Sequence, residues 1–121
     1  MSCKFRLLYH VILVTKYRKK LLLTYGDKVK GIIYRLSEDY KFSIECMEVD
    51  KDHIHILISS SPIYSPKFIV SIIKQITTYN LYKLYGDQPH KEYYRNNVFW
   101  SKGYFINSIG NASEGTIRNL Y

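Results

Sequence analysis

The clearest alternation of hydrophobic and polar positions in the chain is DHIHILI, at residues 52–58. Side chains of a strand point to opposite faces in turn, so Ile54 and Ile56 are expected to face a core. His53 and His55 would then share the other face, with roughly 6.5–7 Å between their Cα atoms. That separation lets both imidazoles bind one divalent ion. The pattern is also typical of the wet face of a half-exposed strand, so it leaves both interpretations open.

The remaining pattern predicts three further strands and three helices. Strands are expected at residues 5–17, at 42–46 and at 99–109, the last with a bend at Gly103. Helices are expected from Gly26-Asp27 to Tyr40, from Ser65 to Tyr85, and from about Ser113 onward. The two longer helices have apolar residues at i, i+3, i+4 and i+7, while Ser65-Pro66 and Ser113 are typical helix starts.

The order of these elements predicts the fold class. A short polar turn at residues 49–52 joins two strands, which indicates an antiparallel hairpin. Strand, helix, strand, strand, helix, strand is the order of an α+β, ferredoxin-like split βαβ sandwich. We therefore expect an antiparallel sheet with two helices on one face, plus a C-terminal helix. At 121 residues, the chain is expected to form one domain over residues 1–121.

Composition narrows the classes of partner. The chain has 18 Lys and Arg against 10 Asp and Glu, and its net charge of +8 favours a polyanion such as nucleic acid. Its 13 tyrosines could stack on unpaired bases, although most tyrosines in a sheet serve packing. Two separated cysteines, no signal peptide and no long apolar run favour a cytoplasmic protein without a membrane span.

Five stretches, in order along the chain, resemble the small HUH-type single-tyrosine transposases of bacterial and archaeal insertion sequences. This insertion-sequence-200-like family acts on single-stranded DNA. The matching stretches are YHVILVTKYR at 9–18, DHIH at 52–55, the helix from Ser65 to Lys74, FWSKGYF at 99–105, and SIG at 108–110 with Ser113-Glu114. The resemblance runs from the first predicted strand to the end of the chain.

The resemblance implies a metal-dependent DNA transposase that cleaves and rejoins single-stranded DNA through a covalent phosphotyrosine intermediate. It implies that His53 and His55 bind a divalent ion, Mg²⁺ or Mn²⁺, and that Asp52 orients one histidine from behind. A hairpin-turn aspartate is the alternative for Asp52. No ATP or organic cofactor is implied.

The resemblance also assigns a nucleophile. Tyr121 lies about two helical turns past Ser113, where the family places its tyrosine, once a one-residue shift from Leu120 is accepted. The family's further metal ligand, a glutamine one turn later, is absent from this chain. Tyr104 is the first alternative to Tyr121.

Further implications concern DNA and assembly. DNA contacts are expected at four basic residues, Lys16, Arg18, Lys67 and Lys74. The expected partners are hairpin transposon ends and a second subunit, whose tyrosine helix can complete the site.

His10, inside the first strand, is expected to be a core or sheet histidine rather than a ligand.

Two rival functions remain open. One is a non-catalytic, single-stranded nucleic-acid-binding module of the same fold, because residues 102–106 faintly resemble the aromatic strand of RNA-recognition sheets. The other is a metal-dependent nuclease that uses activated water and no tyrosine.

Overall fold

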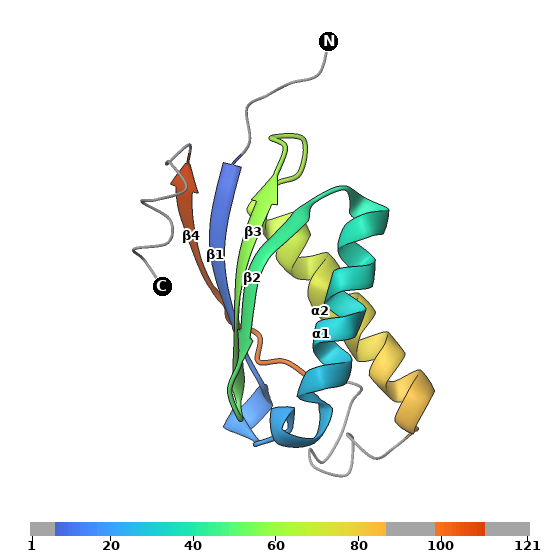
Figure 1. Ribbon diagram of the computed structural model, residues 1–121. Helices are drawn as coiled ribbons and strands as arrows, with labels where there is room; N and C mark the ends of the chain where they lie inside the picture. Colours follow the sequence, from blue (N-terminus) through green and yellow to red (C-terminus); the bar gives the residue numbers. More distant parts are fainter. Residues whose placement is uncertain (1–6, 87–98, 111–121) are drawn as a thin grey trace.

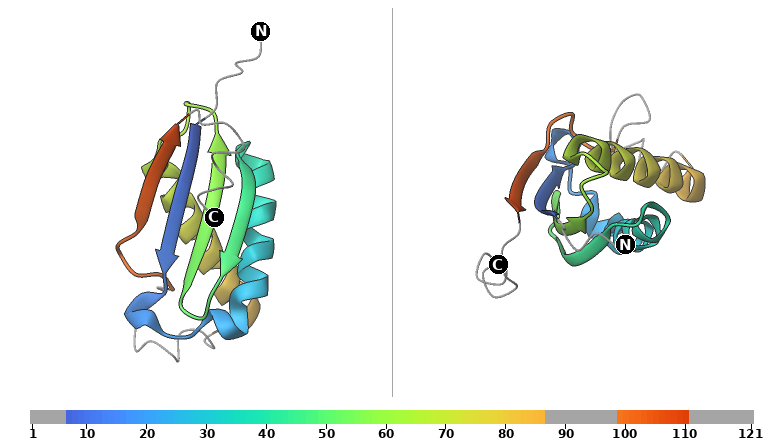
Figure 2. Two further views of the ribbon diagram at one scale, coloured as in Figure 1. Left: turned by 60° about the vertical axis from the view of Figure 1, so that its left-hand side comes forward. Right: turned by 90° about the horizontal axis from the view of Figure 1, so that it is seen from above.

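The computed structural model describes residues 7–86 and 99–110. In these residues a four-stranded antiparallel sheet, in the order β2-β3-β1-β4, carries both helices on one face (Figures 1 and 2). The elements are β1 (Leu7–Val14), α1 (Leu22–Tyr40), β2 (Ser43–Val49), β3 (His53–Ser60), α2 (Pro66–Tyr85) and β4 (Phe105–Gly110). This arrangement confirms the predicted ferredoxin-like α+β sandwich.

The core fills the space between the sheet and the two helices. Alternate residues of the central strands point into it and are almost fully buried, namely Tyr9, Val11 and Leu13 of β1 and Ile54, Ile56 and Ile58 of β3. The helices contribute stripes that include Val29 and Ile33 of α1 and Ile69 and Ile73 of α2. We call this side of the sheet the helix face, and the side that carries His53 and His55 the histidine face.

The strand β3 lies at the centre of the strand pairing. It forms the predicted hairpin with β2, in which Glu48 pairs with His55, and it pairs on its other side with β1, in which Ile12 faces His55. The β2 register shifts between Ile44 and Cys46. Because both neighbours of β3 are strands of the same sheet, the positions of its two histidines are fixed by backbone hydrogen bonds on either side.

The first helix begins earlier than the sequence predicts. It starts at Leu22, so Gly26 lies inside α1 rather than opening it. A Cβ atom placed on Gly26 would come within 2.9 Å of Val49 Cγ1 in β2. The glycine is therefore a close-packing position, and the buried Leu22 and Tyr25 extend the apolar stripe back by a turn.

Three strand boundaries also differ from the prediction. The first strand ends at Val14 and is followed by a short 3-10 turn, η1 (Lys16–Arg18). The second strand continues to Val49, and β4 begins only at Phe105. Before β4, a single bridge pairs Trp100 with Thr15, and the Trp100 indole donates a hydrogen bond to Thr77 Oγ1 at 2.8 Å. Two backbone hydrogen bonds, from Ser101 N to Val14 O and from Lys16 N to Phe99 O, also hold this segment, so β4 proper begins only after it.

Two predictions lie beyond these residues. The expected C-terminal helix from about residue 113, and Tyr121 within it, lie outside the described part of the chain. Neither α1 nor α2 is apolar over a stretch long enough to cross a membrane, and the described residues contain no other candidate span.

Candidate active site

The paired histidines lie at the start of β3, on the side of the sheet away from the helices. Ile54 and Ile56 alternate with them and have no exposed surface, which fixes the face that His53 and His55 occupy. The two imidazole centroids are 5.0 Å apart and both rings are partly exposed. The predicted pair on one face is therefore present in the fold.

A buried carboxylate holds the first histidine. The Nδ1 atom of His53 lies 2.8 Å from Asp52 Oδ1, so His53 donates this hydrogen bond while Nδ1 carries the proton. The second oxygen, Asp52 Oδ2, accepts from Arg18 Nε at 3.0 Å. The hydrogen bonds from His53 and then Arg18 lower the pKa of Asp52 from its ordinary value, although burial opposes them. Asp52 is therefore held as an anion behind His53.

A tight turn after β1 brings Arg18 to Asp52. The hydroxyl of the fully buried Thr15 donates to Lys19 O at 2.6 Å, and the Thr15 amide donates to Asp52 O at 2.9 Å. Tyr17 and Arg18 have φ values of 57° and 52°, a left-handed conformation that costs a non-glycine residue about 1–2 kcal/mol. Strained residues at such a place are common beside functional sites.

A third histidine, His10, which the sequence predicted to be a core or sheet residue rather than a ligand, lies beside the second. The Nε2 atom of His10 is 3.3 Å from His55 Nδ1, and the two rings stack with centroids 5.5 Å apart. Burial, followed by the charge of His55, lowers the pKa of His10 below its ordinary value. Alternation already places His10 opposite the buried Val11, but only the strand register shows which residue it meets.

These contacts define what the site can bind. Both histidines are contacted through Nδ1, by Asp52 and by His10, so Nε2 is the nitrogen that each offers to a cation. The exposed Asp50 carboxylate lies 3.9 Å from His53 Nε2, too far for a hydrogen bond. Two imidazoles on one face fit a divalent ion whose other ligands are oxygens. Across residues 7–86 and 99–110, no three His, Cys, Asp or Glu residues group closely enough to hold a metal. The described residues thus bring together two candidate ligands, His53 and His55.

A comparison with known protein families identifies the family of this chain. The family described as IS200-like transposases matches residues 3–120 of this chain. The chain belongs to this family. It is 33% identical over 112 residues to the transposase of insertion sequence IS200 from Salmonella typhimurium, with 90% of this chain and 68% of that protein covered.

Two solved structures share the fold of this IS200-like transposase. A crystal structure of a candidate transposase from Deinococcus radiodurans gives a TM-score of 0.76 at 23% identity, over 99% of this chain and 89% of that one. A REP-associated tyrosine transposase bound to a REP hairpin gives 0.69 at 14% identity, over 99% and 65%. At these identities the likeness concerns the fold.

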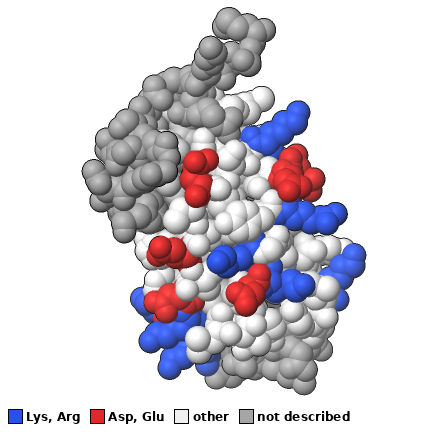
Figure 3. Space-filling view, in the orientation of Figure 1, with Lys and Arg blue, Asp and Glu red and all other residues white. Residues whose placement is uncertain are grey.

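The four predicted DNA-contact residues lie in three different places. Arg18 and Lys16 lie in the turn after β1, where Lys16 Nζ is 5.5 Å from the Tyr17 ring centroid. Lys67 is exposed in the first turn of α2, which follows the far end of β3. In Figure 3 basic side chains gather at the lower left, where Figure 1 shows this turn, and acidic side chains lie among them. The histidine site is therefore close to Arg18 and distant from Lys67.

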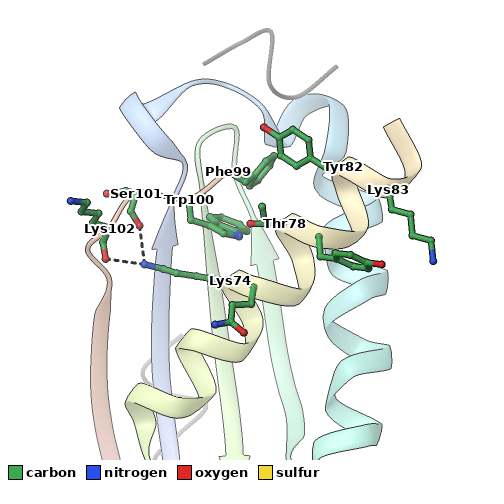
Figure 4. Close-up of a pocket in the computed structure, with 10 residues that line it drawn as sticks. Lys74, Thr78, Tyr82, Lys83, Phe99, Trp100, Ser101 and Lys102 are labelled. Atoms are coloured by element: carbon green, nitrogen blue, oxygen red, sulfur yellow. Dashed lines mark hydrogen bonds between the residues drawn. The ribbon is translucent and has the colours of Figure 1, made fainter. Parts of the chain in front are cut away.

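Lys74 lines a cavity of about 810 Å³ between α2 and residues 99–102. Its ammonium donates to the carbonyl oxygens of Ser101 and Lys102 at 2.8 and 2.9 Å (Figure 4). It also donates to Gly103 O at 3.2 Å. Burial lowers the pKa of Lys74. In this transposase, Lys74 thus ties α2 to the segment that leads into β4, a role the sequence did not indicate.

Proposed function

We propose that this chain is a divalent-metal-dependent DNA transposase that cleaves and rejoins single-stranded DNA through a covalent phosphotyrosine intermediate. Membership of the IS200-like transposase family supports the reaction class. The observation that carries the chemistry is the pair His53 and His55, each contacted at Nδ1 and each presenting Nε2 on the histidine face. Mg²⁺ or Mn²⁺ is the proposed ion.

The ion would polarise the scissile phosphate and stabilise the charge that develops on it. The protein's part is to hold that ion in place. His53 and His55 would bind it, and the Asp52 carboxylate would keep the His53 proton on Nδ1 so that Nε2 keeps its lone pair. Arg18 would keep Asp52 ionised by donating to its other oxygen.

Tyr121 is the proposed nucleophile. Its hydroxyl oxygen would form a bond to phosphorus as one phosphorus–oxygen bond of the DNA breaks, which leaves a free hydroxyl on the released strand end. The reverse attack by a strand-end hydroxyl then rejoins DNA without ATP. Tyr104 is less suited, because its ring lies 5.3 Å from the ammonium of Lys74, which extends from α2 on the helix face.

The proposed DNA partner is a hairpin at each transposon end. One structural relative was solved bound to a REP hairpin, which supports a hairpin as the shape to test here. Lys16, Arg18, Lys67 and Lys74 remain the proposed DNA contacts. We also propose a homodimer in which the tyrosine helix of one subunit reaches the histidines of the other.

The test is formation of a covalent protein–DNA complex. The chain is incubated with Mn²⁺ and single-stranded oligonucleotides from both flanks of its gene, and the product is separated on a denaturing gel. We expect an adduct with the unmodified chain that is lost in Tyr121→Phe and in the double variant of His53→Ala with His55→Ala. Tyr79→Phe, which alters an exposed tyrosine of α2, is the matched control and should keep the adduct.

Other outcomes separate the rival functions. Cut DNA without an adduct would indicate a nuclease that uses water, and bound but uncut DNA would indicate a binding module. If Tyr121→Phe keeps the adduct, mass mapping of the DNA-linked peptide identifies the tyrosine that replaces it. Each of these results contradicts the proposed assignment.

A further inference from the structure

We infer that His10 is a positioning residue that fixes the ring orientation and the protonated nitrogen of His55. It would do for His55 what Asp52 does for His53. The purpose of this orientation rests on the proposed function, since the oriented ring is one of the two proposed metal ligands. The contact between the two rings does not depend on that function.

The strand register creates this contact. His10 pairs with Leu57 and with Asn107, so it lies between β3 and β4 and one diagonal step from His55. Its Nε2 atom lies 3.3 Å from His55 Nδ1, near the long end of the range for a hydrogen bond. Val11 and Leu13 face the core, and Ile12, which pairs with His55 on the same face as His10, has no nitrogen or oxygen in its side chain to offer.

The ring of His10 is itself held on two sides. His55 stacks on it at an interplanar angle of 26°, and Phe105 meets it edge-on with centroids 6.3 Å apart. A side chain confined between two rings has few rotamers left, so it presents Nε2 in a constant direction. A positioning residue needs that property.

The inference specifies which ring nitrogen of each histidine carries the proton. A neutral imidazole carries one proton, so if His55 binds a cation through Nε2 its proton must lie on Nδ1. That Nδ1–H then donates to His10 Nε2, which accepts, and the proton of His10 lies on its own Nδ1. The same arrangement at His53 uses the carboxylate of Asp52 as acceptor. The two histidines thus present Nε2 through matched contacts.

The first experiment uses no metal. Long-range ¹⁵N–¹H spectra of the full chain, recorded above about pH 8 where imidazoles are neutral, show which nitrogen of His55 carries the proton. We expect one dominant tautomer in the unmodified chain and a mixture of both in His10→Ala. His10→Gln, which places an amide near the position of Nε2, should restore a single form. Asn107→Ala, at the β4 position paired with His10, is the matched control and should leave the spectrum of His55 unchanged.

The second experiment measures Mn²⁺ affinity by electron paramagnetic resonance of the free ion. Loss of a residue that orients a metal ligand typically weakens binding about 10- to 100-fold, and we expect about tenfold for His10→Ala. His10→Gln should lie within about threefold of the unmodified chain by the same reasoning.

The two experiments distinguish the failure of each proposal. If the unmodified chain binds no Mn²⁺, the proposed metal site fails, and the tautomer measurement still decides the role of His10. If His10→Ala leaves the tautomer of His55 unchanged, the inference is wrong even where the metal binds. A circular-dichroism melt of each variant shows that it is folded before either measurement.

Discussion

The eight residues of β3 alternate between two faces of the sheet, and the two faces have different functions. On the helix face, Ile54, Ile56 and Ile58 have no exposed surface and belong to the hydrophobic core cluster. On the histidine face, His53 and His55 are partly exposed and contact Asp52 and His10 through nitrogen atoms. One face thus supplies stability through burial, whereas the other supplies oriented polar groups. The difference teaches that at positions 53–56 the effect of a mutation depends on which face of the strand carries the side chain. Farther along β3 both faces are buried, as Leu57 shows.

This comparison predicts its largest effect at the centre of the helix face. Ile56→Ala should lower the free energy of unfolding by about 4 kcal/mol, because it removes buried methyl groups and leaves a cavity. His55→Ala, at the next position, should lower it by less than about 1 kcal/mol. Equilibrium unfolding in urea measures both, and Ile56→Val, with an expected loss of about 1 kcal/mol, is the conservative control. A loss of similar size in His55→Ala would mean that the histidine face is structural.

The sequence showed this division of faces because alternation is a local property. Residues 53–56 alternate histidine and isoleucine, so the positions of His53 and His55 followed without knowledge of any other strand. The order of the elements was enough for the fold class. The partner of His55 was not accessible in this way, since it depends on the register between two strands, and His10 is 45 residues away in sequence.

Other features were missed because their cause is tertiary. Gly26 resembles a helix start in the sequence, yet the helix continues through it where α1 approaches β2. Lys74 resembles a free cation on a helix, yet its acceptors are main-chain carbonyls 27 to 29 residues away. Patterns of residue type do not reveal such long-range contacts. Only the three-dimensional structure shows the contacts of Gly26 and Lys74.

The second prediction tests how tightly the helix face is packed. Gly26→Ala puts a Cβ atom 2.9 Å from Val49 Cγ1, and overpacking of this kind costs about 1–3 kcal/mol. Alanine gains about 1 kcal/mol over glycine inside a helix, so the net loss of stability should be about 1 kcal/mol. Gly31→Ala is the matched control in α1, because a Cβ atom there meets nothing within 4 Å and should stabilise the chain.

Thermal melts measure the coupling between Gly26 and Val49. The variants compared are the two glycine variants, Val49→Ala, and the double variant of Val49→Ala with Gly26→Ala. The double variant should lose less stability than the sum of the single variants, because the smaller side chain makes room for the new methyl group. Equal stabilisation by Gly26→Ala and Gly31→Ala would show that the helix and β2 are not in close contact at this point.

The smallest expected effect concerns the polar groups of the histidine face and appears only as a dependence on pH. The pKa of Asp52 is lowered from its ordinary value of 3.8, so the folded chain binds a proton there less readily than the unfolded chain. The carboxylate therefore contributes stability that is fully present above 3.8 and is lost as the pH falls through the lower folded pKa. Urea unfolding of the unmodified chain and of Asp52→Asn should differ by a constant amount at neutral pH and converge in acid.

Arg18→Gln should raise the pKa of Asp52 in a carboxyl NMR titration, whereas Lys20→Gln, which removes a charge just beyond the same turn, should change it less. If the two substitutions shift that pKa equally, the hydrogen bond from Arg18 has no specific part in holding Asp52 ionised behind His53.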